Sequence, residues 1–167
     1  MKFFGFDMFG RTLKAAGVGA ALMLSVSAGH AQSGPFAGFD GAWSGNGTVS
    51  LSDGSIERIR CRATYAADDT GKALKQSLRC ASDSYKFNLT SNVNSGDGGN
   101  IWGTWSEASR NVNGNLQGRA GGGTIEVFVE AAGFAANLTL TTRGNKQTVQ
   151  ISSKGEIRGV TITMVKS

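Results

Sequence analysis

Two runs of alternating apolar and polar residues, separated by a turn sequence, constrain the fold of this chain more than any other feature. The runs flank D-D-T-G at positions 68–71, an Asp/Gly signal typical of β-hairpins. Folding the chain at that turn places Cys61 directly opposite Cys80 and Ala63 opposite Leu78. One face of the hairpin is then mostly apolar and carries both sulfur atoms. The agreement between turn, alternation and cysteine positions predicts a hairpin that anchors a β-sheet protein.

The first 31 residues have the pattern of a secretory signal peptide and are predicted not to belong to the fold. A basic start is followed by an apolar run over residues 15–27. Gly29 and Ala31 are small residues at the two positions that a signal peptidase reads, which predicts cleavage after Ala31. The apolar run is too short for a permanent transmembrane helix, so a retained anchor is the weaker alternative. We therefore expect a bacterial protein that is periplasmic or secreted.

The remaining residues, 32–167, are enough for one domain with one hydrophobic core. We expect a flexible N-terminal segment over 32–40 and a single β-barrel domain over 41–167. This part of the chain keeps 14 Lys/Arg against 11 Asp/Glu, so the net charge falls from +5 to +3. Both cysteines remain, and an even pair in an exported chain predicts a disulfide, with reduced buried thiols as the alternative.

Short alternating segments between turn signals continue along the chain, and no long stretch has the helical period. A first strand is predicted at about 42–52, before the hairpin. After the hairpin we expect strands over 85–93, 101–107, 112–120, 125–130, 134–140, 148–152 and 157–165, with the clearest loop at 94–99.

The regular spacing predicts an all-β fold of 8–10 strands, paired in chain order as an antiparallel up-and-down meander. Closure into a barrel is favoured because a closed barrel leaves no exposed edge strands, and a β-sandwich is the alternative. An outer-membrane barrel also fits export and alternation. Both sets of loops are short, however, and the last strand has no aromatic girdle residue, which favours a soluble periplasmic domain.

The predicted first strand opens with Gly-x-Trp, as Gly41-Ala42-Trp43, and Gly103-Thr104-Trp105 repeats the pattern. The opening resembles calycin barrels, the lipocalins and the avidin family, in which a Gly-x-Trp begins the first strand and its Trp closes one barrel end. The resemblance implies an exported barrel with an interior that binds a small ligand. Trp43 is then either a ligand contact or only the plug of one end.

Four further aromatic residues are candidates for ligand binding beside Trp43, namely Tyr65, Trp102, Trp105 and Phe128. Trp102 and Trp105 lie three positions apart in a predicted strand and therefore point to opposite faces. One of the two is expected in the core, and the other faces a ligand, a partner or lipid, or is merely covered by a neighbouring side chain. Phe128 raises the same question, because it lies on the polar face of its strand.

The polar face of the anchor hairpin carries the densest group of charges, with Arg58, Arg60, Arg62, Lys75 and Arg79. Arg62 and Arg79 are predicted to lie opposite each other, which is unfavourable unless an anion or a carboxylate lies between them. These residues are candidates for contact with an anionic lipid, a polysaccharide, an acidic protein or a small anion. A solvated outer face is the alternative. The modest net charge argues against nucleic acid.

The residue types of the predicted domain argue against enzymatic activity. The only histidine, His30, lies in the predicted signal peptide, so a Ser-His-Asp triad is impossible and the commonest general base is missing. Zinc bound by His and Cys is excluded as well, because both thiols are assigned to the disulfide. We expect no catalytic residues, no metal and no cofactor.

The sequence leads to a non-enzymatic, exported β-barrel that binds a small apolar or amphipathic ligand. Two alternatives stay open. The first is a protein-interaction module, such as a periplasmic inhibitor of proteases or lysozymes. The second is an envelope-associated structural protein whose basic face rests on anionic lipid or polysaccharide.

Overall fold

The fold was obtained as a computed structural model that describes residues 33–167, so the predicted signal peptide and its cleavage site lie outside the described residues. The strands are β1 (Gly41–Leu51), β2 (Ile56–Ala67), β3 (Ala73–Ala81), β4 (Lys86–Ser95), β5 (Asn100–Glu107), β6 (Val112–Gly121), β7 (Thr124–Ala131), β8 (Phe134–Arg143), β9 (Lys146–Ser153) and β10 (Ile157–Lys166). A single 3-10 turn, η1 (Asp97–Gly99), precedes β5. No helix in this part of the chain is long and apolar enough to cross a bilayer.

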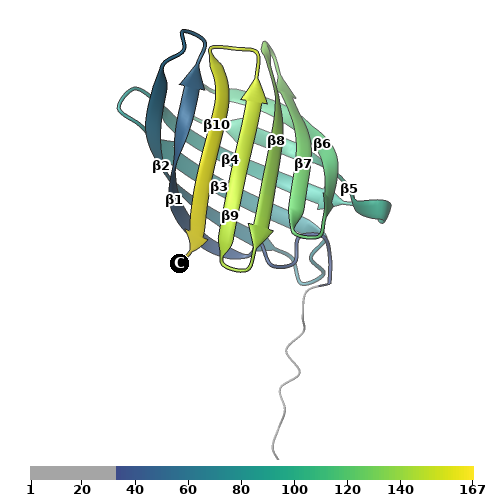
Figure 1. Ribbon diagram of the computed structural model, residues 1–167. Helices are drawn as coiled ribbons and strands as arrows, with labels where there is room; N and C mark the ends of the chain where they lie inside the picture. The colour runs from purple at the N-terminus through teal and green to yellow at the C-terminus, as the bar shows by residue number, and fades with distance from the viewer. Residues whose placement is uncertain (1–32) are drawn as a thin grey trace, which may run out of the picture. The chain divides into compact units, whose positions relative to one another are not determined.

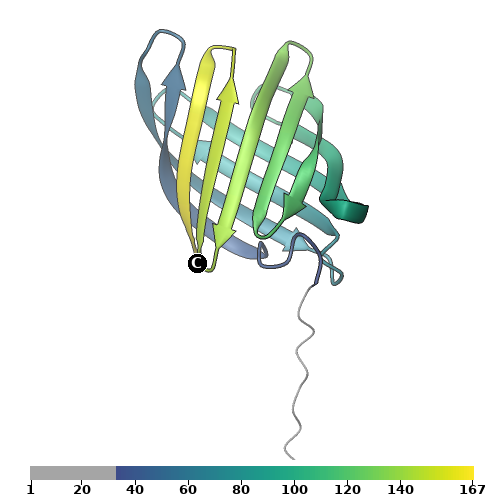
Figure 2. The same ribbon diagram turned by 45° about the vertical axis from the view of Figure 1, so that its right-hand side comes forward.

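Each strand pairs antiparallel with the next along the chain, and β10 pairs with β1, so the ten strands close into a barrel (Figures 1 and 2). The predicted all-β meander is therefore confirmed, and it closes into the predicted barrel and does not form the alternative β-sandwich. The register of the anchor hairpin is also confirmed, with Cys61 opposite Cys80 and Ala63 opposite Leu78. The two cysteines form a disulfide with a Cα–Cα distance of 4.1 Å.

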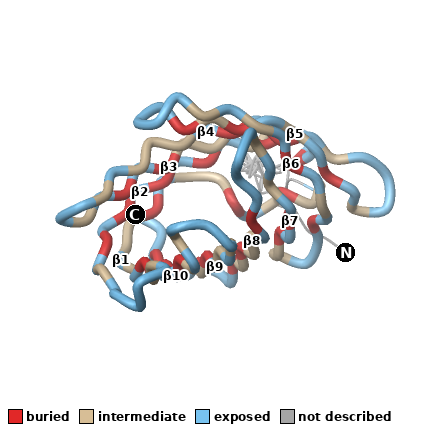
Figure 3. The backbone as a smooth tube through the Cα atoms, turned by 90° about the horizontal axis from the view of Figure 1, so that it is seen from above, coloured by how far each residue is buried: buried red, intermediate tan, exposed pale blue. Residues whose placement is uncertain are grey.

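Buried residues alternate with exposed ones along the strands, so the buried side chains face the inside of the barrel. Figure 3 shows the positions of the buried residues along the backbone in a view onto one end. We call that end the rim; it carries the connections at 52–55, 82–85, 108–111, 132–133 and 154–156. The opposite end, where β1 begins and β10 ends, is called the plug end. Polar and charged residues alternate with the buried ones and face outward.

Phe36, Phe39 and Trp43 close the plug end. Phe36 and Phe39 have 0% exposure and Trp43 has 1%. The indole N–H of Trp43 donates to the carbonyl oxygen of Phe39 at 2.9 Å, and the backbone N–H of Phe36 donates to the carbonyl oxygen of Gly71 at 3.1 Å. Residues 35–39, within the N-terminal segment expected at 32–40, form consecutive turns that contain both buried phenylalanines.

Glycines at inward-facing positions let neighbouring strands approach each other closely. A Cβ atom on Gly45 would overlap the backbone oxygen of Thr163 in β10, and one on Gly103 would overlap that of Asn92 in β4. A side chain at either position would require the neighbouring strand to shift, so glycine preserves the strand pairing there.

Candidate functional site

A ladder of polar side chains crosses the barrel interior near the plug end. The hydroxyl of Tyr65 donates to Oε1 of Gln147 at 2.9 Å, and Nε2 of Gln147 donates to Oγ1 of Thr142 at 3.1 Å. On the other side, Nε2 of Gln76 donates to the Tyr65 hydroxyl at 3.3 Å, and Oγ of Ser91 donates to Oε1 of Gln76 at 2.9 Å. Burial raises the pKa of Tyr65, and the hydrogen bond from Gln76 opposes this shift only in part. The phenol therefore stays neutral and can act as a donor.

Many inward-facing residues of the rim half are apolar and only partly buried. Phe134, at the start of β8, is 37% exposed. The others share its inward orientation and pack against the edge of the core: Leu51, Phe87, Leu89, Val112, Val129, Ala131, Leu138, Ile151 and Ile157. Water thus reaches apolar side chains at the rim, whereas the aromatic residues at the plug end are fully covered.

The five aromatic candidates occupy three different places. Trp43 lies in the plug, and Tyr65 belongs to the polar ladder. Trp105 faces inward, is 8% exposed and meets the ring of Phe134 edge-on at 5.7 Å between centroids. Trp102 faces outward from the same strand and is 51% exposed, so the expectation that the two tryptophans point to opposite faces is correct.

Phe128 joins Trp102 on the outer face of the barrel. Both border a hollow of about 790 Å³ that also includes Gln117 and Asn137 from neighbouring strands. The structure thus separates this outer pair from Tyr65 and Trp105 in the interior. Sequence alternation identified the opposite orientations of Trp102 and Trp105, but it could not show which of them faces the interior.

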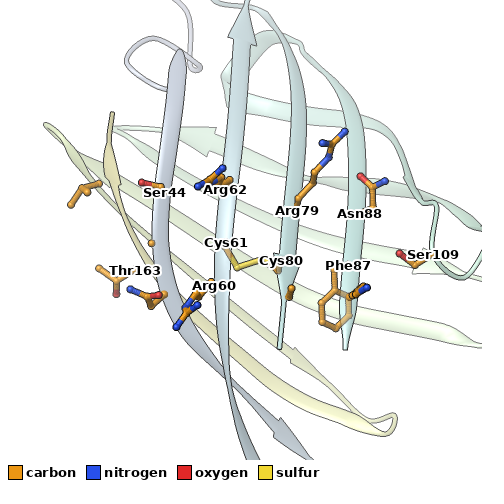
Figure 4. Close-up of a pocket in the computed structure, with 15 residues that line it drawn as sticks. Ser44, Arg60, Cys61, Arg62, Arg79, Cys80, Phe87, Asn88, Ser109 and Thr163 are labelled. Carbon is orange, nitrogen blue, oxygen red and sulfur yellow. A yellow bond between two sulfur atoms is a disulfide. The ribbon is translucent and has the colours of Figure 1, made fainter. Parts of the chain in front are cut away.

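The basic residues of the hairpin lie on the outer face, above the disulfide. Arg60, Arg62 and Arg79 line a hollow of about 1090 Å³ together with Lys86 of β4. Figure 4 shows the arginine side chains on neighbouring strands, beside Ser44, Asn88 and Thr163. Arg58 and Lys75 are exposed elsewhere on the same strands and do not line the hollow.

Lys86 is the residue of this group that the sequence reading missed. It lies directly opposite Ala81, which in turn lies opposite Arg60, so the three share one row across β2, β3 and β4. The alternation of β4 alone places Lys86 on the outer face. The pairing of β3 with β4 is needed to show that Lys86 lies beside the basic residues of the hairpin.

Glu107 is the one carboxylate buried among the described residues, at 6% exposure. It accepts hydrogen bonds from the backbone N–H groups of Asn88, Ser109 and Arg110, at 2.8, 3.1 and 2.8 Å. Burial raises the pKa of Glu107, but the hydrogen bonds from these residues outweigh it, so the pKa lies below its ordinary value. The hydrogen bonds from Ser109 and Arg110 hold the Glu107 side chain against the β5–β6 connection at the rim.

No group of three or more His, Cys, Asp and Glu side chains among residues 33–167 is arranged to hold a metal ion. The interior combines apolar walls with the uncharged polar ladder, while the outer face of the hairpin carries cations.

Comparison with known proteins supports the fold. No protein-family model and no curated protein sequence matches this chain. Among solved structures, the chain is similar to the crystal structure of Rv2717c from M. tuberculosis, with a TM-score of 0.62 and 11% sequence identity. The similarity covers 80% of this chain and 93% of that one. At this identity the likeness concerns the fold alone. The barrel is consistent with a calycin-like fold.

Proposed function

We propose that this protein is an exported, non-enzymatic binding protein whose barrel takes up a small apolar or amphipathic molecule through the rim. The contrast between the two ends is the observation that carries the proposal. Phe36 and Phe39 are completely buried at the plug end, whereas inward-facing apolar residues at the rim, Phe134 above all, remain partly exposed. An apolar guest would cover this surface, and each Å² removed from water contributes about 25 cal/mol.

The size of the barrel supports the same proposal. Eight strands already give an interior wide enough to hold one small ligand, and the diameter grows with strand number. This barrel has ten strands. A barrel of this width can accommodate a guest beside the partly exposed apolar side chains of the rim.

The polar ladder supports an amphipathic guest. Gln76 faces inward and is only partly buried, and its amide is hydrogen-bonded to Tyr65 and Ser91. These groups can exchange hydrogen bonds with an uncharged polar end of a guest, while the rim surrounds its apolar part. Small-molecule sites commonly combine apolar walls with a few polar groups in this way.

Native mass spectrometry of the protein purified from its source cell tests the proposal, together with titration of a fluorescent apolar probe, N-phenyl-1-naphthylamine. We expect a copurified small molecule, or saturable probe binding that quenches tryptophan emission. Leu138→Gln places an amide on the inward side of β8 and is expected to weaken probe binding about tenfold, which corresponds to about 1.4 kcal/mol.

Thr139→Gln is the matched control, because the adjacent residue of the same strand faces outward and pairs with Glu126 and Gln150. It should leave probe binding unchanged. Val129→Trp, which fills the rim with an apolar side chain, provides a second test if Leu138→Gln proves unstable. No copurified molecule, combined with probe binding that neither inward variant alters, would remove the proposal.

A further inference from the structure

The charges on the outer face of this barrel are segregated by strand. The outward-facing positions of β2, β3 and β4 carry Arg58, Arg60, Arg62, Lys75, Arg79 and Lys86. No Asp or Glu occupies an outward-facing position of β1, β2, β3 or β4, and β10 contains neither residue type. The acidic residues near these strands lie in the connections or, like Glu57, on the inward side of a strand.

None of the residues that line the hollow is acidic. Among residues 33–167, the side chains of Arg60, Arg62, Arg79 and Lys86 make no ion pair or hydrogen bond; the carbonyl oxygen of Lys86 accepts one from Nη1 of Arg110 at 3.3 Å. Arg62 lies directly opposite Arg79. Like charges at directly opposite positions destabilise a strand pair, so a ligand anion between them would be stabilising.

The number of cations indicates the charge of that anion. Neighbouring strands lie about 4.8 Å apart, which places Arg62 and Arg79 within reach of one small oxyanion. A single carboxylate carries one negative charge, whereas a phosphate monoester carries about −1.5 to −2 at neutral pH. Guanidinium groups also match phosphate oxygens in a two-pronged geometry. A phosphate group therefore fits the hollow better than a carboxylate does.

The uncharged residues of the hollow suit the same ligand. Ser44 lies opposite Arg62, Asn46 lies opposite Arg60, and Asn88 lies opposite Arg79. Their hydroxyl and amide groups can donate hydrogen bonds to oxygen atoms. The hollow thus combines four cations with neutral donors on five adjacent strands, β10, β1, β2, β3 and β4.

We infer that the hollow on the outer face, formed by Arg60, Arg62, Arg79 and Lys86, is a binding site for a phosphomonoester or diphosphate group. This site is separate from the barrel interior and does not depend on the function proposed above. The phosphate belongs either to a soluble ester or to a lipid headgroup, since both present the same oxygen atoms to the arginines.

Isothermal titration calorimetry with inorganic pyrophosphate, at low ionic strength, tests the site directly. We expect saturable binding by the wild-type protein, and a loss of about tenfold to hundredfold in Arg62→Gln/Arg79→Gln, because hydrogen bonds to charged groups are strong. Lys146→Gln/Lys154→Gln removes the same charge from exposed positions outside the hollow and should bind like the wild type. Acetate should bind at least about tenfold more weakly than pyrophosphate, because it carries less charge.

Thermal unfolding shows whether a loss of pyrophosphate binding results from misfolding of the variant. Without pyrophosphate, Arg62→Gln/Arg79→Gln should unfold at the wild-type temperature or above it, because the variant removes a repulsive pair. Pyrophosphate should raise the unfolding temperature of the wild type and of the control variant only. Equal binding loss in both double variants, equal affinity for acetate, or no binding of pyrophosphate would each overturn the proposal.

Sedimentation with vesicles identifies the source of the phosphate. If phosphatidic acid vesicles bind the wild type and the control variant but not Arg62→Gln/Arg79→Gln, the phosphate is a lipid headgroup. If pyrophosphate binds and these vesicles do not, the ligand is a soluble phosphate ester. Vesicles of phosphatidylcholine alone should bind none of the three proteins, and equal binding to them would contradict a charge-dependent site.

Discussion

The hydroxyl of Tyr65 donates a hydrogen bond to the side-chain oxygen of Gln147 at 2.9 Å, although the two residues lie 82 positions apart in the sequence. Tyr65 is 3% exposed and Gln147 is 0% exposed, so this bond connects β2 with β9 through the protein interior. Buried polar groups are costly unless they are hydrogen-bonded. The pair therefore fixes the position of two strands that do not pair with each other.

Tyr65→Phe should destabilise the barrel by about 1–3 kcal/mol, because it leaves the oxygen of Gln147 buried without its donor. Urea denaturation followed by tryptophan fluorescence measures the effect. Tyr85→Phe is the control, since the Tyr85 hydroxyl bonds to Glu156 at an exposed site and its loss should change stability little. Equal effects of the two substitutions would contradict the structural role of the interior ladder.

Glu107 should make the stability of the protein depend on pH. Its pKa lies below the ordinary value of 4.5 in the folded state, so its contribution is fully present above that value and is lost as the pH falls through the folded pKa. Glu107→Gln should cost about 1–2 kcal/mol at pH 7, because two acceptor oxygens become one. Below the folded pKa the variant and the wild type should converge. If the difference in stability between the two proteins stayed constant down to the folded pKa, the carboxylate charge would not be its cause.

Loss of the Cys61–Cys80 disulfide should lower stability by about 3 kcal/mol, mostly through greater freedom of the unfolded chain. Cys61→Ala/Cys80→Ala tests this in guanidinium denaturation. Adding a reductant should weaken the wild type and leave the double variant unchanged. An equal response of both proteins to the reductant would mean that the bridge does not form in solution.

Gly45→Ala should destabilise the barrel by about 1–3 kcal/mol, as expected when an added group finds no space. A Cβ atom at that position would overlap the backbone oxygen of Thr163 and force β1 away from β10. Gly155→Ala is the control, because a Cβ atom there meets nothing within 4 Å. The difference between the two midpoints of thermal unfolding measures the strand contact.

Phe39→Ala should cost about 3–5 kcal/mol, the usual range for a fully buried aromatic residue. Phe134→Ala, at the partly exposed rim, should cost much less. If the segment before β1 were loosely attached in solution, Phe39→Ala would be as mild as Phe134→Ala. Hydrogen exchange at Phe36, whose N–H is bonded to Gly71, gives an independent measurement.

Much of the fold could be predicted because antiparallel barrels are built from local pairs. The register of Cys61 and Cys80 follows from one turn and a two-residue period, and both lie within 20 residues of the turn. Chain order then gives the remaining neighbours. The pairing of β1 with β10 was predicted only because an open sheet would leave two exposed edge strands. No local sequence signal indicates that pairing.

The candidate site was predicted less completely. The alternation placed Arg62 opposite Arg79, but Lys86 joined this group only through the pairing of β3 with β4. Trp43 was predicted to be either a plug or a ligand contact; it is buried and donates to the carbonyl oxygen of Phe39, and its role toward a ligand stays a prediction. The polar ladder was not predicted, because no sequence signal within a single strand indicates that Tyr65, Gln76 and Gln147 meet in the interior.

By itself, the sequence determined the strand periodicity, the turns, the cysteine pair and the side of each strand that carries charge. These properties depend on residues close together in the chain, where a two-residue period decides which face is apolar. Only the tertiary structure decided which end of the barrel is closed, which polar groups meet inside it, and that the cations of three strands share one hollow. The interior contacts join residues from distant strands, and the cations come together only through the register of β2, β3 and β4.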